Sequence, residues 1–427
     1  MKSNDSPLTL PSPRKRGEGV DTRRSVFLPE IEVNRQVIEP FEDELNAAGS
    51  DGHLRAMRAV DSQQGRVIRL NGRDCVNFSS NDYLGLSSHP AIKKAVHDCV
   101  GKYGWGSGSS RLISGNMTPH IEFEEKAAAF LGKPSALLFT SGYAANVGTL
   151  TALLGKGDTV YLDRLCHASS MDGARFSGAK LERFIHNDPE SLEKHLSKAV
   201  SSKGRRLVVT EGLFSMDGDR APLKEIAQAA KRHGALLMVD DAHGVGVFGP
   251  GGRGAIHEAG VADLVDIHVI TLGKALGGVG GVVAGSKKLV EGLVNFARSF
   301  IYSTALPPAT AEAGTVAIGI VDSPDGEERR MRLKRNVEAV VSMLKNKCYD
   351  IGQSGSQIIP ALFDKERLAG VAARLLEKGI FVPAIKHPTV PMGTERFRVS
   401  LTCEHTEGDI VALMSAFEEL KAGRAHV

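Results

Sequence analysis

The fold is decided by residues 267–278, IHVITLGKALGG. A mostly apolar run ends in a Thr-Leu-Gly-Lys sequence, and such a short run bounded by turn residues predicts a buried strand. Lys274 would then follow the carboxyl end of that strand, where α/β sheets bind their ligands. The glycines on either side let the backbone pass close to a bulky group. A lysine in such a pocket can lose its proton and attack a carbonyl carbon, although an isolated Gly-Lys pair is more often a surface feature.

The composition is that of an ordinary globular protein. The 427 residues are 42% hydrophobic, which is enough for a large core and suggests two or three domains. Because 53 basic residues nearly balance 50 acidic ones, we expect neither a nucleic-acid partner nor a membrane partner. The five cysteines lack CxxC spacing, so we expect no disulfide framework and no metal site, and a reducing, cytoplasmic location. No apolar run approaches transmembrane length.

The chain changes character along its length. Residues 1–30 are rich in proline, serine and basic residues without apolar periodicity, so we expect a disordered extension. Residues 31–75 predict a charged helix over 38–59, followed by a hairpin with an Asn-Gly turn. Over 76–315 strands and helices alternate, which predicts a large domain with a mostly parallel central sheet. Long charged helices then predict a smaller C-terminal domain over 316–427.

Residues with useful chemistry recur where the predicted strands end. Asp240 and His243 follow one strand, and Lys274 follows the next. Gly142 and Tyr143 open a helix after another strand, and the positive end of such a helix suits a phosphate group. Further candidates at strand ends are His167, Ser215 and Thr271. Each alone is more often structural, a satisfied core histidine or a helix cap, but their common position favours a ligand site.

Pyridoxal 5′-phosphate (PLP) requires a set of this kind. It needs a lysine, an acid at the ring nitrogen so that the ring acts as an electron sink, a phosphate cradle and a flat group over the ring. The glycine-rich residues 277–281 lack the G-x-G-x-x-G spacing and no helical pattern follows them. A dinucleotide-binding site is therefore rejected.

Seven motifs in order resemble the α-oxoamine synthases, which are PLP-dependent enzymes of fold type I. The resemblance covers about residues 40–420 and implies an α/β large domain with a mostly parallel sheet and a smaller C-terminal α+β domain. The motifs are NDYLGL (81–86), GSSR (108–111), HAS (167–169), FSMDG (214–218), VDDAHG (239–244), TLGK (271–274) and RFRVSL (396–401).

The resemblance also implies roles for individual residues. Lys274 would bind the cofactor and later move protons, Asp240 would pair with the pyridinium nitrogen, and His167 would stack on the ring; these are the implied catalytic residues. The other implied cofactor contacts are Gly142, Tyr143, Ser215, His243, Thr271 and Thr304, the last reaching the phosphate from a neighbouring subunit. The implied substrate contacts are Arg55, Asn81, Thr389 and Arg398, of which Arg398 would hold the amino acid's carboxylate as a bidentate fork.

Three further segments resemble one branch of the family, which condenses L-alanine with a pimeloyl thioester in biotin biosynthesis. They are DRL (163–165), TEG (210–212) and the tail 382–391. The implied reaction is a decarboxylative, Claisen-type condensation in which the pimeloyl group arrives on coenzyme A or on a carrier protein. Sites of this family lie between two subunits, so a homodimer is implied. Cys166 departs from the family pattern, which has Asn or Ser at that position.

Other functions remain open at this point. Family members that use glycine, such as glycine C-acetyltransferase and aminolevulinate synthase, and serine palmitoyltransferase share most of the motifs, although the tail 382–391 favours the alanine branch. A PLP-binding regulator without catalysis would need a fused DNA-binding domain, and the N-terminal region is too short and unpatterned for one. A scaffold with an inactive site is disfavoured because Lys274, Asp240 and His243 are all present.

Overall fold

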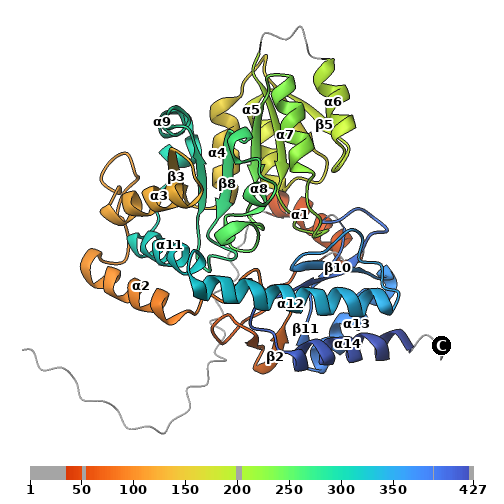
Figure 1. Ribbon diagram of the computed structural model, residues 1–427. Helices are drawn as coiled ribbons and strands as arrows, with labels where there is room; N and C mark the ends of the chain where they lie inside the picture. The colour runs from red at the N-terminus through yellow and green to blue at the C-terminus, as the bar shows by residue number, and fades with distance from the viewer. Residues whose placement is uncertain (1–34, 51–53, 199–203, 388, 423–427) are drawn as a thin grey trace, which may run out of the picture. The chain divides into compact units, whose positions relative to one another are not determined.

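The computed structural model describes residues 35–50, 54–198, 204–387 and 389–422 (Figure 1). The chain divides into two compact units, residues 1–56 and 57–427. The first unit contains α1 (Arg35–Ser50). The helix predicted over 38–59 was therefore too long at its C-terminal end, and Gly49 near the observed end accounts for the earlier stop because glycine disfavours the helical backbone. The extension expected over 1–30 lies outside the described residues.

A seven-stranded sheet forms the centre of the second unit (Figure 1). Its strands are β3 (Ser135–Phe139), β4 (Thr159–Asp163), β5 (Lys180–Phe184), β6 (Arg206–Glu211), β7 (Leu236–Asp240), β8 (Ile267–Thr271) and β9 (Gly281–Gly285). Their order is β3-β9-β8-β7-β6-β4-β5, and only β9 runs antiparallel to its neighbours. The predicted mostly parallel sheet is confirmed. β8 is buried throughout, as its apolar sequence predicted.

Helices cover both faces of this sheet. One apolar cluster joins a face of the sheet to α4 (Gly142–Leu153), α5 (Ala168–Ser177), α9 (Lys287–Phe296) and α10 (Arg298–Ile301). Two clusters on the other side contain α2 (Pro90–Tyr103), α3 (Thr118–Phe130), α6 (Pro189–Ser197), α7 (Leu223–Arg232), α8 (Ala255–Glu258) and α11 (Pro308–Val321). In α7 the predicted apolar face is buried, with Leu223, Ile226 and Ala230 almost fully enclosed. None of the described helices is long and apolar enough to cross a membrane.

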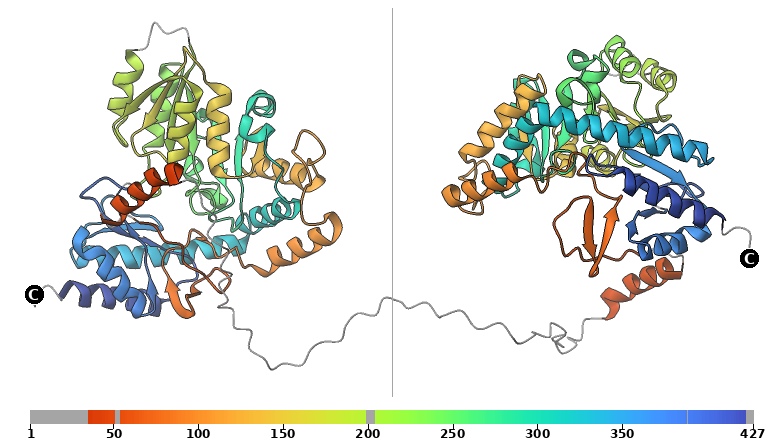
Figure 2. Two further views of the ribbon diagram at one scale, coloured as in Figure 1. Left: turned by 180° about the vertical axis from the view of Figure 1, so that it is seen from behind. Right: turned by 60° about the horizontal axis from the view of Figure 1, so that its bottom comes forward.

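Two three-stranded sheets accompany the central one (Figure 2). The predicted hairpin is confirmed as β1 (Val67–Leu70) and β2 (Arg73–Asn77), which β11 (Ile380–Phe381) extends. Asn71 and Gly72 make its turn with positive φ angles of 51° and 78°. The antiparallel strands β10 (Ile358–Leu362), β13 (Arg396–Ser400) and β12 (Ala384–Ile385) form the other sheet. The C-terminal helices are α12 (Pro324–Asn346), α13 (Lys365–Glu377) and α14 (Glu407–Ala422).

The loop 214–219 links the central sheet to the sheet of β10 and β13. Gly218 has a φ of 64°, and a Cβ atom there would lie 1.8 Å from the carbonyl oxygen of Ile358. The hydroxyl of Ser356 donates a hydrogen bond of 2.8 Å to the carbonyl of Gly218. A glycine is therefore required at this point both by its backbone conformation and by the close approach of β10.

We predict that Gly218→Ala lowers stability by at least about 1–3 kcal/mol, because it combines left-handed strain with a backbone clash. The measurement is the midpoint of unfolding in denaturant. Gly370→Ala in α13 is the matched control, since a Cβ at Gly370 meets nothing within 4 Å and should leave stability unchanged or raise it. Equal midpoints for Gly218→Ala and the parent chain would contradict the close approach.

Candidate active site

A cavity of about 130 Å³ lies at the carboxyl ends of β6, β7 and β8 and at the N-terminus of α4. This is the edge at which open α/β sheets bind ligands. The predicted site residues that line it are Gly142, Tyr143, His167, Asp240, His243, Thr271 and Lys274. The other lining residues are Asn146, Ser169, Glu211, Ala242, Val269 and Ile270. Residues that are far apart in the sequence thus meet around one space.

Lys274 lies just beyond the end of β8 and reaches into this cavity. The turn that carries Lys274 requires a glycine at position 277. There φ is 66°, and a Cβ atom would lie 2.4 Å from the backbone nitrogen of Ser87. Burial lowers the pKa of Lys274, while the negative charges of Asp240 and Glu211 oppose that shift. The site therefore favours a neutral amine, which is the nucleophilic form, more than water does.

Asp240 ends β7, and its carboxylate is held from two sides. One oxygen, Oδ1, accepts the backbone N–H of Ala242 at 3.0 Å. The other, Oδ2, accepts the side-chain amide of Asn146 at 2.7 Å. The same amide nitrogen also donates to the hydroxyl of Ser169 at 2.9 Å, so α4 and α5 fix the carboxylate together. The buried Oδ1 of Asn146 has no partner among the described residues, which leaves an acceptor beside the cavity.

His167 caps the N-terminus of α5 beside the same cavity. Its backbone N–H donates to Oε1 of Glu211 at 2.5 Å, and its ring Nδ1 accepts the backbone N–H of Ser169 at 3.2 Å. The surrounding protein lowers the pKa of His167 by desolvation, although the charge of Asp240 raises it. Burial raises the pKa of Glu211 well above its usual range, and the charge of Asp240 adds to that shift. The wall thus offers a largely neutral imidazole that keeps an exposed face.

A partly buried chain of hydrogen bonds runs from His243 to Arg398. Nδ1 of His243 lies 2.7 Å from the hydroxyl of Tyr83, which donates to Oδ1 of Asn81 at 3.2 Å. The same Oδ1 accepts Nη2 of Arg398 at 3.3 Å. Burial raises the pKa of Tyr83 to about 12, and burial together with the charges of Lys274 and Arg398 lowers the pKa of His243 well below its usual range. The predicted substrate residues Asn81 and Arg398 are thereby coupled to the cavity.

Arg398 projects from β13 and is 6% exposed. Its Nε donates to the carbonyl of Ser215 at 2.6 Å, its Nη1 to the hydroxyl of Ser400 at 2.7 Å and its Nη2 to Asn81. A guanidinium has five N–H groups, one on Nε and two on each Nη. These contacts fix the plane of the guanidinium, and a guanidinium can bind a carboxylate through two parallel N–H groups.

Some predicted site residues do not line the cavity. Ser215 contacts Arg398 through its carbonyl. Thr304 is exposed and forms an isolated β-bridge with Ser110. Thr389 is exposed in the loop before β13. Arg55 belongs to the unit of residues 1–56, so its predicted contact with substrate stays a prediction.

The structure adds site residues that the sequence did not single out. Asn146, Ser169 and Glu211 line the cavity, and Tyr83 bridges His243 to Asn81. Glu211 is the last residue of β6, so the same strand-end position that pointed to Asp240 would have found it. Asn146 sits on the second turn of α4, where only the rotation of the helix against β7 shows that it meets Asp240.

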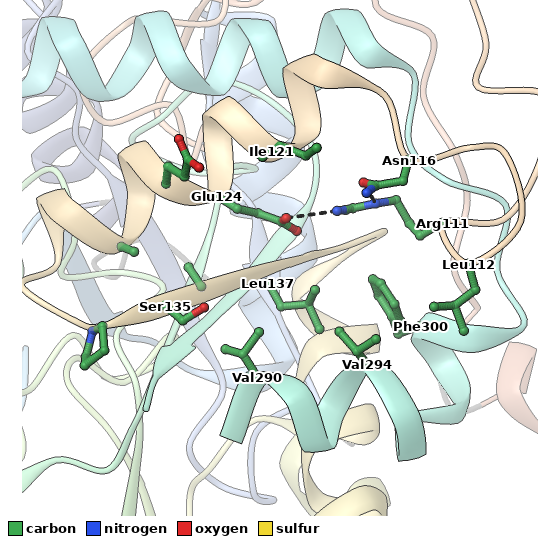
Figure 3. Close-up of a pocket in the computed structure, with 14 residues that line it drawn as sticks. Arg111, Leu112, Asn116, Ile121, Glu124, Ser135, Leu137, Val290, Val294 and Phe300 are labelled. Atoms are coloured by element: carbon green, nitrogen blue, oxygen red, sulfur yellow. Dashed lines mark hydrogen bonds and ion pairs between the residues drawn. The ribbon is translucent and has the colours of Figure 1, made fainter. Parts of the chain in front are cut away.

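A larger cavity of about 330 Å³ lies between α3 and α9, over β3 (Figure 3). Arg111 donates to Glu124 at 2.9 Å and to Asn116 at 2.8 Å, and both side chains of the Arg111–Glu124 pair are nearly buried. The remaining labelled walls are mostly apolar and include Leu137 and Phe300. Because Arg111 is already paired with Glu124 and no lysine lines this cavity, it is unsuited to PLP chemistry. Among the described residues no group of His, Cys, Asp and Glu could hold a metal ion.

Comparison with known proteins identifies the family to which the chain belongs. Residues 73–417 match the family model of aminotransferase class I and II. The chain belongs to this family. An 8-amino-7-oxononanoate synthase from Geotalea daltonii is 46% identical over 380 residues, which are 89% of this chain and 97% of that protein. The predicted family is thus confirmed, together with its branch.

Solved structures extend the comparison to the fold. Serine palmitoyltransferase from S. paucimobilis, with a bound PLP–myriocin aldimine, matches with a TM-score of 0.86 at 30% identity and covers 92% of this chain and 100% of that one. An 8-amino-7-oxononanoate synthase from Francisella tularensis matches with a TM-score of 0.71 at 31% identity, covering 82% of this chain and 99% of that one. The fold is therefore that of PLP-dependent enzymes of fold type I, as predicted.

We predict that Lys274→Ala abolishes turnover and leaves the fold intact, because one side chain leaves a preformed cavity and no hydrogen bond of the wall is lost. Borohydride treatment of the PLP-loaded protein, followed by peptide mass analysis, should place the cofactor on Lys274 in the parent chain only. Lys288→Ala, at an exposed position of α9, is the control and should behave like the parent. Near-normal product formation by Lys274→Ala would contradict the assignment.

Proposed function

We propose that this chain binds PLP in the cavity around Lys274 and condenses L-alanine with a pimeloyl thioester, the reaction of 8-amino-7-oxononanoate synthases in biotin biosynthesis. The buried Lys274 amine, opposite an Asp240 carboxylate fixed by Asn146, carries the assignment of PLP chemistry. The 46% identity with an 8-amino-7-oxononanoate synthase along nearly its whole length carries the choice of reaction. When bound, PLP supplies an electron sink for negative charge at the amino acid's α-carbon.

The residues of the cavity fit this cofactor. Asp240, held by Asn146, would pair with the ring nitrogen, and His167, which lines the cavity, would supply the flat group against the ring. The intrahelical ladder of α4 begins with Ala145 donating to Ser141, so the N–H groups of Gly142 and Tyr143 at the helix N-terminus are available to phosphate oxygens. His243 would serve the side of the ring hydroxyl, together with Ser215 from outside the cavity lining, and Thr271 would serve the surroundings of the phosphate.

Arg398 is proposed to bind the carboxylate of L-alanine. Its contacts with Ser215, Ser400 and Asn81 fix the plane of the guanidinium, and we propose that its remaining N–H groups pair with both carboxylate oxygens. A bidentate pair of this kind fixes the orientation of the amino acid as well as its position. Because every α-amino acid has this carboxylate, Arg398 does not choose between alanine, glycine and serine.

Lys274 is proposed to move the proton of the α-carbon. Burial favours the neutral amine, so the nitrogen can accept a proton once it is released from the cofactor. The carbon that loses this proton attacks the thioester carbonyl and the thiol of coenzyme A or of a carrier protein leaves. Loss of the original carboxylate as CO2 then requires a proton at the same carbon, and we propose that Lys274 returns it.

A second copy of the chain is proposed to complete the site. Thr304 is exposed and lies outside the Lys274 cavity of its own chain, as does the exposed Thr389. Trp105, Ile113 and Tyr302 are 71%, 81% and 71% exposed in the loops around Thr304, and such apolar exposure favours an interface. We propose a homodimer in which Thr304 serves the phosphate of the partner's site. The five free cysteines support a cytoplasmic location.

The alternative within the family is a different substrate pair. The serine palmitoyltransferase neighbours share the fold at about 30% identity, so the site geometry alone does not separate the branches. Glycine C-acetyltransferase, the second candidate from the sequence, is disfavoured by the 46% identity with an 8-amino-7-oxononanoate synthase. A non-catalytic PLP-binding protein is disfavoured because Lys274, Asp240 and His243 are all present and line one cavity.

We predict that L-alanine with a pimeloyl thioester gives a higher kcat/KM than glycine with acetyl or succinyl thioesters and than serine with palmitoyl thioester. One methyl group in an apolar pocket is worth about 1–3 kcal/mol, so glycine should be about 10–200-fold poorer than alanine with the same thioester. The assay is thiol release, with the ketone confirmed by mass. If glycine with a short thioester gave the highest kcat/KM, the assignment to the alanine branch would be wrong. The assignment of PLP chemistry to this site would still hold.

The proposed dimer predicts complementation between two defective chains. Lys274→Ala and Thr304→Ala chains, mixed so that they exchange partners, should form heterodimers in which one site has Lys274 from one chain and Thr304 from the other. Activity should therefore rise above that of either variant alone at low PLP concentration. No rise, in a mixture shown by light scattering to contain heterodimers, would mean that Thr304 acts within its own chain.

A further inference from the structure

His186 lies between two carboxylates outside the proposed PLP cavity. Its ring Nδ1 is 2.9 Å from Oδ1 of Asp163, and its Nε2 is 2.7 Å from Oδ2 of Asp219. Asp163 is fully buried and Asp219 nearly so. The ring also packs edge-on against Phe214, with 4.4 Å between centroids. No part of the proposed reaction uses this cluster.

The geometry assigns a proton to each ring nitrogen. A carboxylate offers only acceptors, so both nitrogens must donate if both contacts are hydrogen bonds. Burial alone would lower the pKa of His186, but the hydrogen bonds and charges of Asp163 and Asp219 outweigh it and raise the pKa to about 10. His186 is then an imidazolium held between two anions at neutral pH.

One of these anions fixes the turn that carries His167. Asp163 ends β4, and its Oδ1 accepts the backbone N–H of Leu165 at 2.9 Å while its carbonyl accepts that of Cys166 at 3.2 Å. His167 follows immediately and enters the wall of the cavity. The contact between His186 and Asp163 therefore lies at the start of the short turn that leads to His167.

The other anion fixes the loop that carries Ser215. Asp219 closes the loop 214–219, since its carbonyl accepts the N–H of Phe214 at 3.0 Å. Within that loop the carbonyl of Ser215 holds Nε of Arg398 at 2.6 Å. Asn187 strengthens the junction, because its N–H donates to Asp163 at 2.9 Å and its side-chain amide to Asp219 at 2.7 Å.

We propose that His186 is a positioning residue: it holds the turn before His167 and the loop around Ser215 at a fixed separation, and so fixes how Arg398 presents an amino-acid carboxylate to the cofactor site. This inference rests on the proposed use of Arg398. Without the cation, two buried carboxylates would face each other and repel, and the two segments would separate. The expected damage is to substrate orientation, which small displacements impair strongly.

The state of His186 is tested on the protein without cofactor. In chains labelled with 15N-histidine, one imidazole should keep the nitrogen shifts of an imidazolium up to pH 8–9, while ordinary histidines titrate near pH 6.5. The signal should vanish in His186→Gln. If every histidine is neutral at pH 8, the charged junction does not exist and the inference falls.

The positioning role is tested by amino-acid binding to the PLP-loaded protein, followed through the change in cofactor absorbance. His186→Gln should raise the apparent Kd for L-alanine roughly ten- to hundred-fold and leave the KM for the thioester nearly unchanged. His233→Gln is the matched control, because Nε2 of His233 pairs with Glu193 at 2.6 Å at the end of α7, away from the cavity. A parent-like Kd in soluble, PLP-binding His186→Gln would overturn the inference.

A second variant guards against a folding defect. Asp219→Asn keeps an acceptor for Nε2 of His186 but removes one charge, so it should raise the Kd for L-alanine less than His186→Gln does. A fall in melting temperature with an unchanged Kd in either variant would show a purely structural role and overturn positioning. If the parent chain binds glycine or serine but not alanine, the proposed reaction fails, and the same comparison with the accepted amino acid still tests His186.

Discussion

Enclosing the amine of Lys274 in a low-dielectric cavity with Asp240 and Glu211 is the constraint on which the rest of the site depends. The negative charge of Asp240 opposes the lowering of the Lys274 pKa and adds to the raising of the Glu211 pKa, so the charge states of Lys274 and Glu211 depend on where Asp240 is held. Each carboxyl group is accordingly tied to a regular element: Asp240 to α4 through Asn146, and Glu211 to the start of α5 through the N–H of His167. The ends of the parallel strands determine where the two carboxyl groups lie, and contacts from α4 and from the start of α5 hold these side chains in place.

The sequence predicted the buried strands of the sheet well, because β4, β7 and β8 are short apolar runs closed by polar residues. It missed β5, where Lys180, Glu182 and Arg183 give a charged edge strand with no apolar period. The antiparallel direction of β9 could have been predicted from the sequence, since the connection formed by residues 272–280 is too short for a parallel crossover. The late end predicted for α1 arose because charged residues continue the helical pattern beyond Gly49.

For the candidate site, strand-end position and family resemblance found the residues that the backbone itself places at the cavity, such as Asp240 and Lys274. They did not find Asn146 or Tyr83, whose contacts depend on how a helix and a loop pack against the sheet. Thr304 and Arg55 are two predicted site residues whose roles this cavity does not test. Thr304 lies outside the cavity of its own chain and Arg55 belongs to the other compact unit, so the geometry of one cavity does not test them.

The loop 214–219 shows how substrate binding and cofactor binding can share one scaffold. On one side Arg396 pairs with Asp217 and Arg398 holds Ser215, both from β13. On the other side His186 holds Asp219 at the ends of the central strands. Because the loop is held at both edges by partly buried charged contacts, a shift of one sheet would displace the loop relative to the other sheet. The orientation of Arg398 is therefore a property of both sheets, although the residue belongs to only one.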